Sequence, residues 1–296
     1  MRSDTDVERT GDLPEGIPLV TRESVLAKAR ALVMQARNAF PAWNPPPFDP
    51  QIYAALLGIP IAECRGMDCD ALLVPASPGF RILCNATVRS TGRRRFSIAH
   101  ELVHTLFPDS AGAYHLRNVA PQQNLFADSQ QLERLCEEGA AELLMPEDCF
   151  RAHLEELGLR ASAVQILADR FQVSLEATAL RITETSETPC AVALLDYQVR
   201  PSTQRCADQE ELLAEPRRYR VRCSYRSTGF PFLFPRGKSV PWTSVIYQAA
   251  TCRDDREGRE TFVLGKQECE LSVSASALAH AGTAVVPPAV CAVFRM

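Results

Sequence analysis

The apolar positions of this chain follow a helical period over its first two thirds and alternate with polar positions over its last third. Residues 22–40 carry apolar side chains three and four positions apart, which predicts an amphipathic helix. Asp49 and Pro50 are a typical cap and first residue for a short helix that would end near Gly58. Short apolar runs bounded by turn residues then predict strands at residues 59–62, 71–74 and 80–85.

Helical spacing resumes at about residue 95 and ends at Phe107, because Pro108 cannot continue a helix. Two more helices are expected over residues 131–144 and 146–157. The segment 162–184 then predicts a pair of short helices, with Ser174 as the cap of the second. Such a pair has the rhythm of a helix-turn-helix.

Past Pro189 the pattern changes to short strands, in PCAVALLDY, RRYRVRCSYR, RETFVLG and AVCAVFRM. In the second of these, alternation predicts that Arg218, Arg220 and Arg222 line one strand face. Such a face is usually solvated, and less often docks an acidic partner. The fold class is therefore α+β, and three parts are expected. They are a disordered lead-in over 1–18, a mainly helical domain with a small sheet over 19–187, and an α+β domain over 188–296.

Composition places the chain among ordinary globular proteins, with 46% hydrophobic and 23% charged residues. The net charge of -4 argues against a general nucleic-acid binder. No apolar run approaches the roughly 18 residues that span a bilayer, and the N-terminus lacks the apolar region of a secretory signal. The 11 cysteines are scattered without a CxxC pair, which favours a reduced, cytoplasmic setting.

The helix expected at 95–107 contains the sequence HELVH, from His100 to His104. Residues four apart lie on one helix face, so both imidazoles can reach a common ion about 2.0–2.1 Å away. Glu101 is rotated by about 100° from His100, which places it beside the ion as a general base. The alternative is an amphipathic helix that carries two surface histidines by accident.

A protein zinc site with one position left for water needs a third protein ligand, and the next helix offers four glutamates. Glu133 and Glu137 share one face, so one could bind the ion while the other accepts the free N–H of a ligand histidine. Glu138 and Glu142 share a different face, which we expect to be solvated. The alternative is an ordinary charged amphipathic helix.

The two motifs together, FSIAHELVH and E-x-L-C-x-x-x-A-A-E-L-L-M-P, resemble the ImmA/IrrE family of bacterial metallopeptidases over roughly residues 22–185. The resemblance implies a zincin-like fold in which Glu133 is the third metal ligand. It places Glu137 where asparagine is usual, beside the ligands. Val103 replaces a common glycine, and Gly139 replaces a core phenylalanine, which predicts weaker packing there. None of these departures removes a ligand or the base.

The family resemblance implies peptide-bond hydrolysis with one Zn2+ or Mn2+ per chain, held by His100, His104 and Glu133. Glu101 would move the proton from the attacking water to the leaving amine. Tyr114 and His115 are candidate oxyanion donors by position alone. The substrate would lie extended beside the strand at 80–85 or its neighbour.

The family's usual substrate is a helix-turn-helix repressor, cut in response to DNA damage or mobile-element signals. Residues 188–296 would then be a sensor or interaction domain, similar in strand texture to a GAF-like domain. One alternative is a DNA-binding regulator, although Arg181 is the only basic residue in the second short helix, with Glu176 and Glu184 beside it. Another is a regulatory protein that keeps the metal without proteolysis. Neither membrane attachment nor direct nucleic-acid binding is expected.

Overall fold

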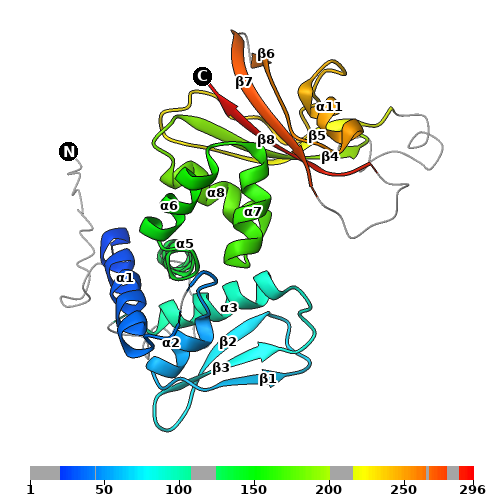
Figure 1. The fold of residues 1–296 in the computed structure, drawn as a ribbon. Coiled ribbons are helices and arrows are strands. Elements are labelled where there is room, and N and C mark those ends of the chain that lie inside the picture. Colours follow the sequence, from blue (N-terminus) through cyan, green and yellow to red (C-terminus); the bar gives the residue numbers. More distant parts are fainter. Residues whose placement is uncertain (1–20, 44, 108–124, 201–215, 265–266, 279–286) are drawn as a thin grey trace, which may run out of the picture.

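The computed structural model describes residues 21–43, 45–107, 125–200, 216–264, 267–278 and 287–296. It confirms an α+β fold, in which a small sheet and a larger sheet lie at opposite ends of a group of helices (Figure 1). Among the described residues, no helix is both long and apolar enough to cross a membrane. The expected lead-in over 1–18, as well as Tyr114 and His115, lies outside the described residues.

The first two helices begin where the sequence predicts. Helix α1 (Arg22–Ala39) is capped by Thr21, whose hydroxyl accepts the N–H of Ser24. Helix α2 (Pro50–Leu56) is capped by Asp49, whose carboxylate accepts the N–H of Gln51 at 3.0 Å. These side chains satisfy N–H groups that have no partner within the helix, which fixes each start locally.

The small sheet has the order β1-β3-β2, so β3 is its central strand. Strand β1 pairs with β3 in parallel, and β2 pairs with β3 antiparallel. Strand β2 is therefore an edge strand, and it packs against helix α3. The bounds are β1 (Ile61–Cys64), β2 (Ala71–Pro75) and β3 (Phe80–Asn85), so β1 starts two residues later than predicted.

Helix α3 begins earlier than its apolar pattern indicates, because Ser90 caps it by accepting the N–H of Arg93. Helix α5 also begins earlier than predicted, before the polar stretch DSQQ that hides its start in the sequence. Ser174 caps α8 as predicted. The helix bounds are α3 (Thr91–His104), α5 (Leu125–Leu144), α6 (Glu147–Leu157), α7 (Ala161–Phe171) and α8 (Leu175–Thr185).

The larger sheet is antiparallel, in the order β5-β4-β8-β7-β6. Helices α7 and α8 cover one face, and helix α11 covers the other (Figure 1). Its elements are β4 (Cys190–Gln198), β5 (Arg218–Arg226), α11 (Val245–Cys252), β6 (Arg256–Leu264), β7 (Gln267–Ala277) and β8 (Val290–Arg295).

Side chains on both faces of β4 are buried. Cys190, Val192 and Leu194 face the helical part of the chain and join its core, whereas the residues between them join a second core under α11. Apolar side chains on both faces of the strand are removed from water, and this burial stabilises it. The apolar core therefore continues across the junction between α8 and β4, and the predicted division at 187–188 lies inside one packed structure.

The predicted exposed row of three arginines on β5 is wrong. A bulge pairs Leu194 with Cys223 and Leu195 with Val221, which makes Arg222 an extra residue and reverses the alternation beyond it. Arg220 is only 5% exposed, and Arg222 pairs with Glu176 of α8 at 2.8 Å.

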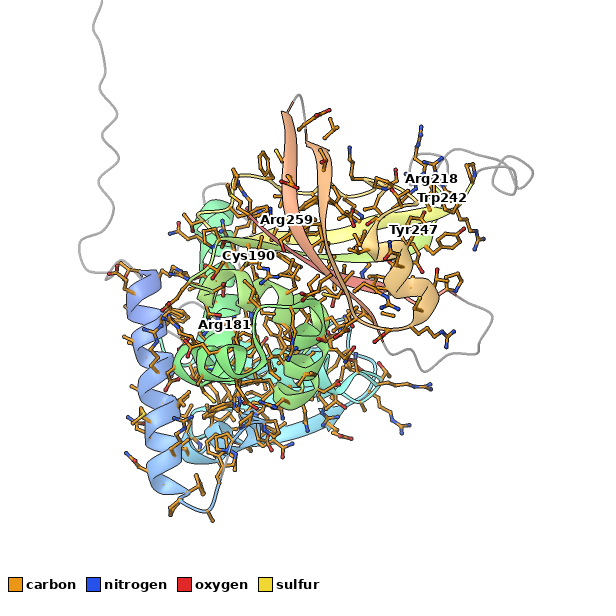
Figure 2. The ribbon with its side chains drawn as sticks, turned by 45° about the horizontal axis from the view of Figure 1, so that its top comes forward. Arg181, Cys190, Arg218, Trp242, Tyr247 and Arg259 are labelled. Carbon is orange, nitrogen blue, oxygen red and sulfur yellow. The ribbon has the colours of Figure 1, made fainter. Side chains whose placement is uncertain are left out.

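The remaining arginine of this row lies at one end of the sheet. Figure 2 shows Arg218 beside Trp242 and Tyr247, next to α11. Its guanidinium carbon lies 5.9 Å from the centre of the Trp242 ring, within the range of a cation–π contact. The three arginines therefore meet different partners, and they do not form one patch for an acidic protein.

A buried ion pair ties α8 to α5. The carboxylate of Glu142 is only 1% exposed, so the prediction of a solvated face is wrong. Arg181 donates to this carboxylate and, through Nε at 3.0 Å, to the carbonyl of Met145. Arg30 of α1 donates to the other carboxylate oxygen at 2.9 Å. Figure 2 shows Arg181 among the helices, so the basic residue of the helix-turn-helix-like segment supports packing.

We expect Arg181→Ala to lower the free energy of unfolding by about 3 kcal/mol, because it leaves a buried carboxylate with one partner fewer. Urea denaturation followed by circular dichroism measures this loss. The matched control is Arg22→Ala, whose partner Glu138 lies near the surface and whose own side chain is 60% exposed. This control should cost less than about 1 kcal/mol. Equal losses in the two variants would contradict the role given to Arg181.

Candidate metal centre

Helix α3 directs its two histidines at the same point. The Nε2 atoms of His100 and His104 are 3.1 Å apart, and the two rings lie at 75° to each other. The neighbouring residues Ile98, Leu102 and Val103 are buried, so the apolar face fixes the rotation of the helix. The histidines therefore lie at the inner side of α3, and His104 itself is only 6% exposed.

Helix α5 brings Glu133 to the same point. Its Oε2 lies 3.0 Å from His100 Nε2 and 3.7 Å from His104 Nε2. Three donors around a tetrahedral ion with bonds of 2.0–2.1 Å would be separated by about 3.3–3.4 Å. The observed triangle brackets this value, so these two imidazoles and one carboxylate fit a divalent ion. The Glu133 side chain is 38% exposed, which leaves this side of the site open to water.

Glu101 follows His100 directly on α3 and is held by the small sheet. Its carboxylate is buried and accepts the backbone N–H of Leu73 at 2.9 Å through Oε2. After burial itself, the Glu101 charge contributes most to raising the pKa of the Cys69 thiol, in the loop before β2. The sequence predicted a base at this position, and the structure shows that strand β2 fixes its orientation.

The sequence predicted that the substrate would lie beside residues 80–85 or a neighbouring strand. Residues 80–85 form the central strand β3, whose two edges already pair with β1 and β2. Its neighbour β2 has a free lateral edge with respect to the sheet, and this edge faces α3. The N–H of Leu73 that reaches Glu101 lies on this edge.

The residue beside His104 differs from the one predicted. Glu137 is exposed, so the structure does not place it against a ligand histidine. Instead Cys136, which is fully buried, lies with its Sγ 3.2 Å from His104 Nδ1. The sequence alone indicated no role for individual cysteines, because they are scattered without a CxxC pair. The available signal was that Cys136 follows Glu133 by three positions, which places both on one face of α5.

The two unusual residues of the motifs lie opposite each other. A Cβ added at Gly139 would be 2.8 Å from Val103 Cγ1 and 3.0 Å from Val25 Cγ1. Val103 thus fills space that a larger residue at position 139 would occupy. The predicted weakening of packing at Gly139 is therefore offset, because the valine on α3 supplies the missing volume.

Comparison with known proteins agrees with this site. Residues 54–183 match the sequence model of the IrrE N-terminal-like domain. The radiation response metalloprotease IrrE of Deinococcus radiodurans is 25% identical over 77% of this chain and 68% of its own length. The protein of the same name from Deinococcus deserti is 30% identical over 54% of this chain, which spans about half (53%) of that relative.

Among solved structures, a Mycobacterium tuberculosis transcriptional regulator matches with a TM-score of 0.49 and 18% identity. The match covers 93% of this chain and 80% of that chain, and it is too distant to bear on function.

An HExxH helix completed by a glutamate from the following helix is typical of metal-dependent peptidases, and this chain is of that class. Within the class, the motifs, the matched domain and the relatives agree. Residues 54–183 resemble the IrrE N-terminal-like domain, and the two relatives support an assignment to the ImmA/IrrE family.

We expect Gly139→Ala to destabilise the protein by about 1–2 kcal/mol, because the new methyl group overlaps Val103 in a packed core. In a Val103→Ala background the same change should cost less, because only the contact with Val25 Cγ1 at 3.0 Å remains and alanine favours the helix by up to about 1 kcal/mol. A double-mutant cycle in urea should give a coupling energy of about 1–3 kcal/mol. Additive effects of the two substitutions would show that these side chains do not compete for one space.

Proposed function

We propose that this protein is an endopeptidase that cleaves a helix-turn-helix transcriptional repressor in a stress or mobile-element response. The observation that carries the proposal is the convergence of His100, His104 and Glu133, with Glu101 next to His100 in the helix and bound to Leu73. The names of its relatives, radiation response metalloproteases, support a role in a stress response. The setting we propose is the cytoplasm, where a repressor acts.

The proposed cofactor is one Zn2+ or Mn2+ per chain, held by the two histidines and Glu133. Such an ion, when bound, polarises the scissile carbonyl and makes a water molecule more acidic. Glu101 takes the proton of the attacking water and later passes it to the leaving amine. Since Leu73 holds Oε2 of this carboxylate, the proton goes to Oε1.

Strand β2 is the proposed support for the substrate backbone. The backbone bonds Asn85 N–H to Asp70 C=O and Ala76 N–H to Gly79 C=O show which residues of this hairpin pair inward. By alternation, the backbone groups of Ala71 and Leu73 point to the outer edge. An extended peptide that added to this edge would run between β2 and the metal ligands on α3.

Residues 188–296 are the proposed sensor or interaction domain, and a GAF-like fold remains a prediction for them. The antiparallel sheet packs on α7 and α8, and α8 is tied to the ligand-bearing helix α5 through Arg181 and Glu142. A partner or signal that shifted the sheet would therefore also shift α8 and, through it, α5.

The direct test is to look for a helix-turn-helix repressor encoded near this gene and to incubate its product with this protein and added Zn2+ or Mn2+. We expect the wild type to cut it at a defined bond, seen by mass spectrometry. Glu101→Gln should bind as much metal but cut about 100- to 10,000-fold more slowly, because the proton acceptor is gone. Glu155→Gln, an exposed residue of α6, is the matched control and should cut at the wild-type rate.

Three results would contradict the proposal or part of it. Unchanged cleavage by Glu101→Gln would remove this residue from the mechanism. A wild type that binds metal and repressor but leaves the repressor intact would favour a regulatory protein without proteolysis. Retention of the chain on DNA at physiological salt would instead favour a DNA-binding regulator.

A further inference from the structure

We propose that Cys136 is a positioning residue of the metal centre, which holds His104 in the tautomer and orientation needed to bind the ion. The inference rests on the proposed metal site. It concerns a thiol to which neither the HExxH motif nor the third ligand assigns a role.

The contact between Cys136 and His104 is short and shielded from solvent. Cys136 Sγ lies 3.2 Å from His104 Nδ1, Cys136 is fully buried, and His104 is only 6% exposed. The two nitrogens of the ring therefore have different neighbours. Nε2 faces the other two metal donors, at 3.1 Å from His100 and 3.7 Å from Glu133. Nδ1 faces the sulfur.

The different neighbours of the two ring nitrogens indicate which nitrogen carries the proton when an ion is bound. A nitrogen that binds an ion must offer its lone pair, so His104 binds through Nε2 only when Nδ1 carries the hydrogen. Nδ1–H then donates to the Cys136 sulfur, an acceptor that adds no charge to the site. The opposite tautomer would place a hydrogen on Nε2, where it would block the ion. Metal-binding histidines generally need such a partner at the second nitrogen, most often a carboxylate or a carbonyl.

An ordinary core cysteine would look different. Cys84, Cys136 and Cys291 are all buried in the same apolar core, where a cysteine ordinarily behaves as a small hydrophobic residue, but the sulfur of Cys136 also lies 3.2 Å from a ring nitrogen of His104. Cys136 follows Glu133 by three positions on α5, so this helix supplies one metal ligand and orients another. A shift of α5 along α3 would disturb both contacts together.

The experiment measures Zn2+ affinity by competition with a chromogenic chelator, in the full-length protein. Cys136→Val removes the acceptor and nearly preserves the shape of the side chain, so it should bind Zn2+ about 10- to 100-fold more weakly. Cys136→Ser restores an acceptor and should recover most of this loss. The matched control is Cys291→Val, the same substitution at a buried position on β8, which should bind like the wild type.

A second measurement separates positioning from general damage. The visible absorption of the Co2+-loaded protein reports ligand geometry, and its bands should shift in Cys136→Val but not in Cys291→Val. Circular dichroism identifies a variant that does not fold. If Cys136→Val is such a variant, the smaller Cys136→Ala takes its place with the same expected loss of affinity.

The outcomes distinguish this inference from the proposed function. A folded Cys136→Val that binds Zn2+ as tightly as the wild type overturns the positioning role and leaves the metal site intact. A Cys136→Ser as weak as Cys136→Val also overturns it, because the acceptor would not matter. A wild type that binds neither Zn2+ nor Co2+ overturns the metal site itself, and the role of Cys136 with it.

Discussion

The approach of helix α5 to helix α3 is the constraint on which the site depends. Two of the three donors come from α3 and the third, Glu133, comes from α5, so the ligand triangle exists only at one separation of the two helices. Gly139 permits this separation, because any larger side chain would meet Val103 and Val25. Helix–helix distance is set by the residues at the contact. The contact between Gly139 and Val103 therefore helps to set the helix separation at which the three donors meet.

The same helix is fixed again at Glu142, three residues beyond Gly139. Glu142 is buried between arginines of α1 and α8, and α8 in turn packs under the larger sheet. An isolated buried carboxylate is costly, so these partners hold α5 at a defined position along its length. Glu133 therefore contacts His100, and Cys136 contacts Nδ1 of His104, from a helix whose position is fixed by its packing. The positions of the metal ligands are therefore set partly by packing contacts outside the site.

Sequence predicted the features that depend on neighbours along the chain. The caps at Asp49 and Ser174 and the HELVH helix follow from local spacing. It failed for residues whose partners are distant. Glu142 looks like any surface glutamate until Arg181 is placed 39 positions away against it. Arg220 was assigned to a solvated face because a strict alternation does not foresee the β5 bulge. The role proposed for Cys136 could not be predicted from the sequence, because it depends on how α5 packs against α3.

The most direct test is a crystal structure of the Zn2+-loaded protein with anomalous data at the zinc edge. The account predicts one ion per chain, about 2.0–2.1 Å from Nε2 of His100, Nε2 of His104 and a carboxylate oxygen of Glu133. A zinc peak elsewhere, or a Glu133 side chain turned away from an ion on the two histidines, would contradict it.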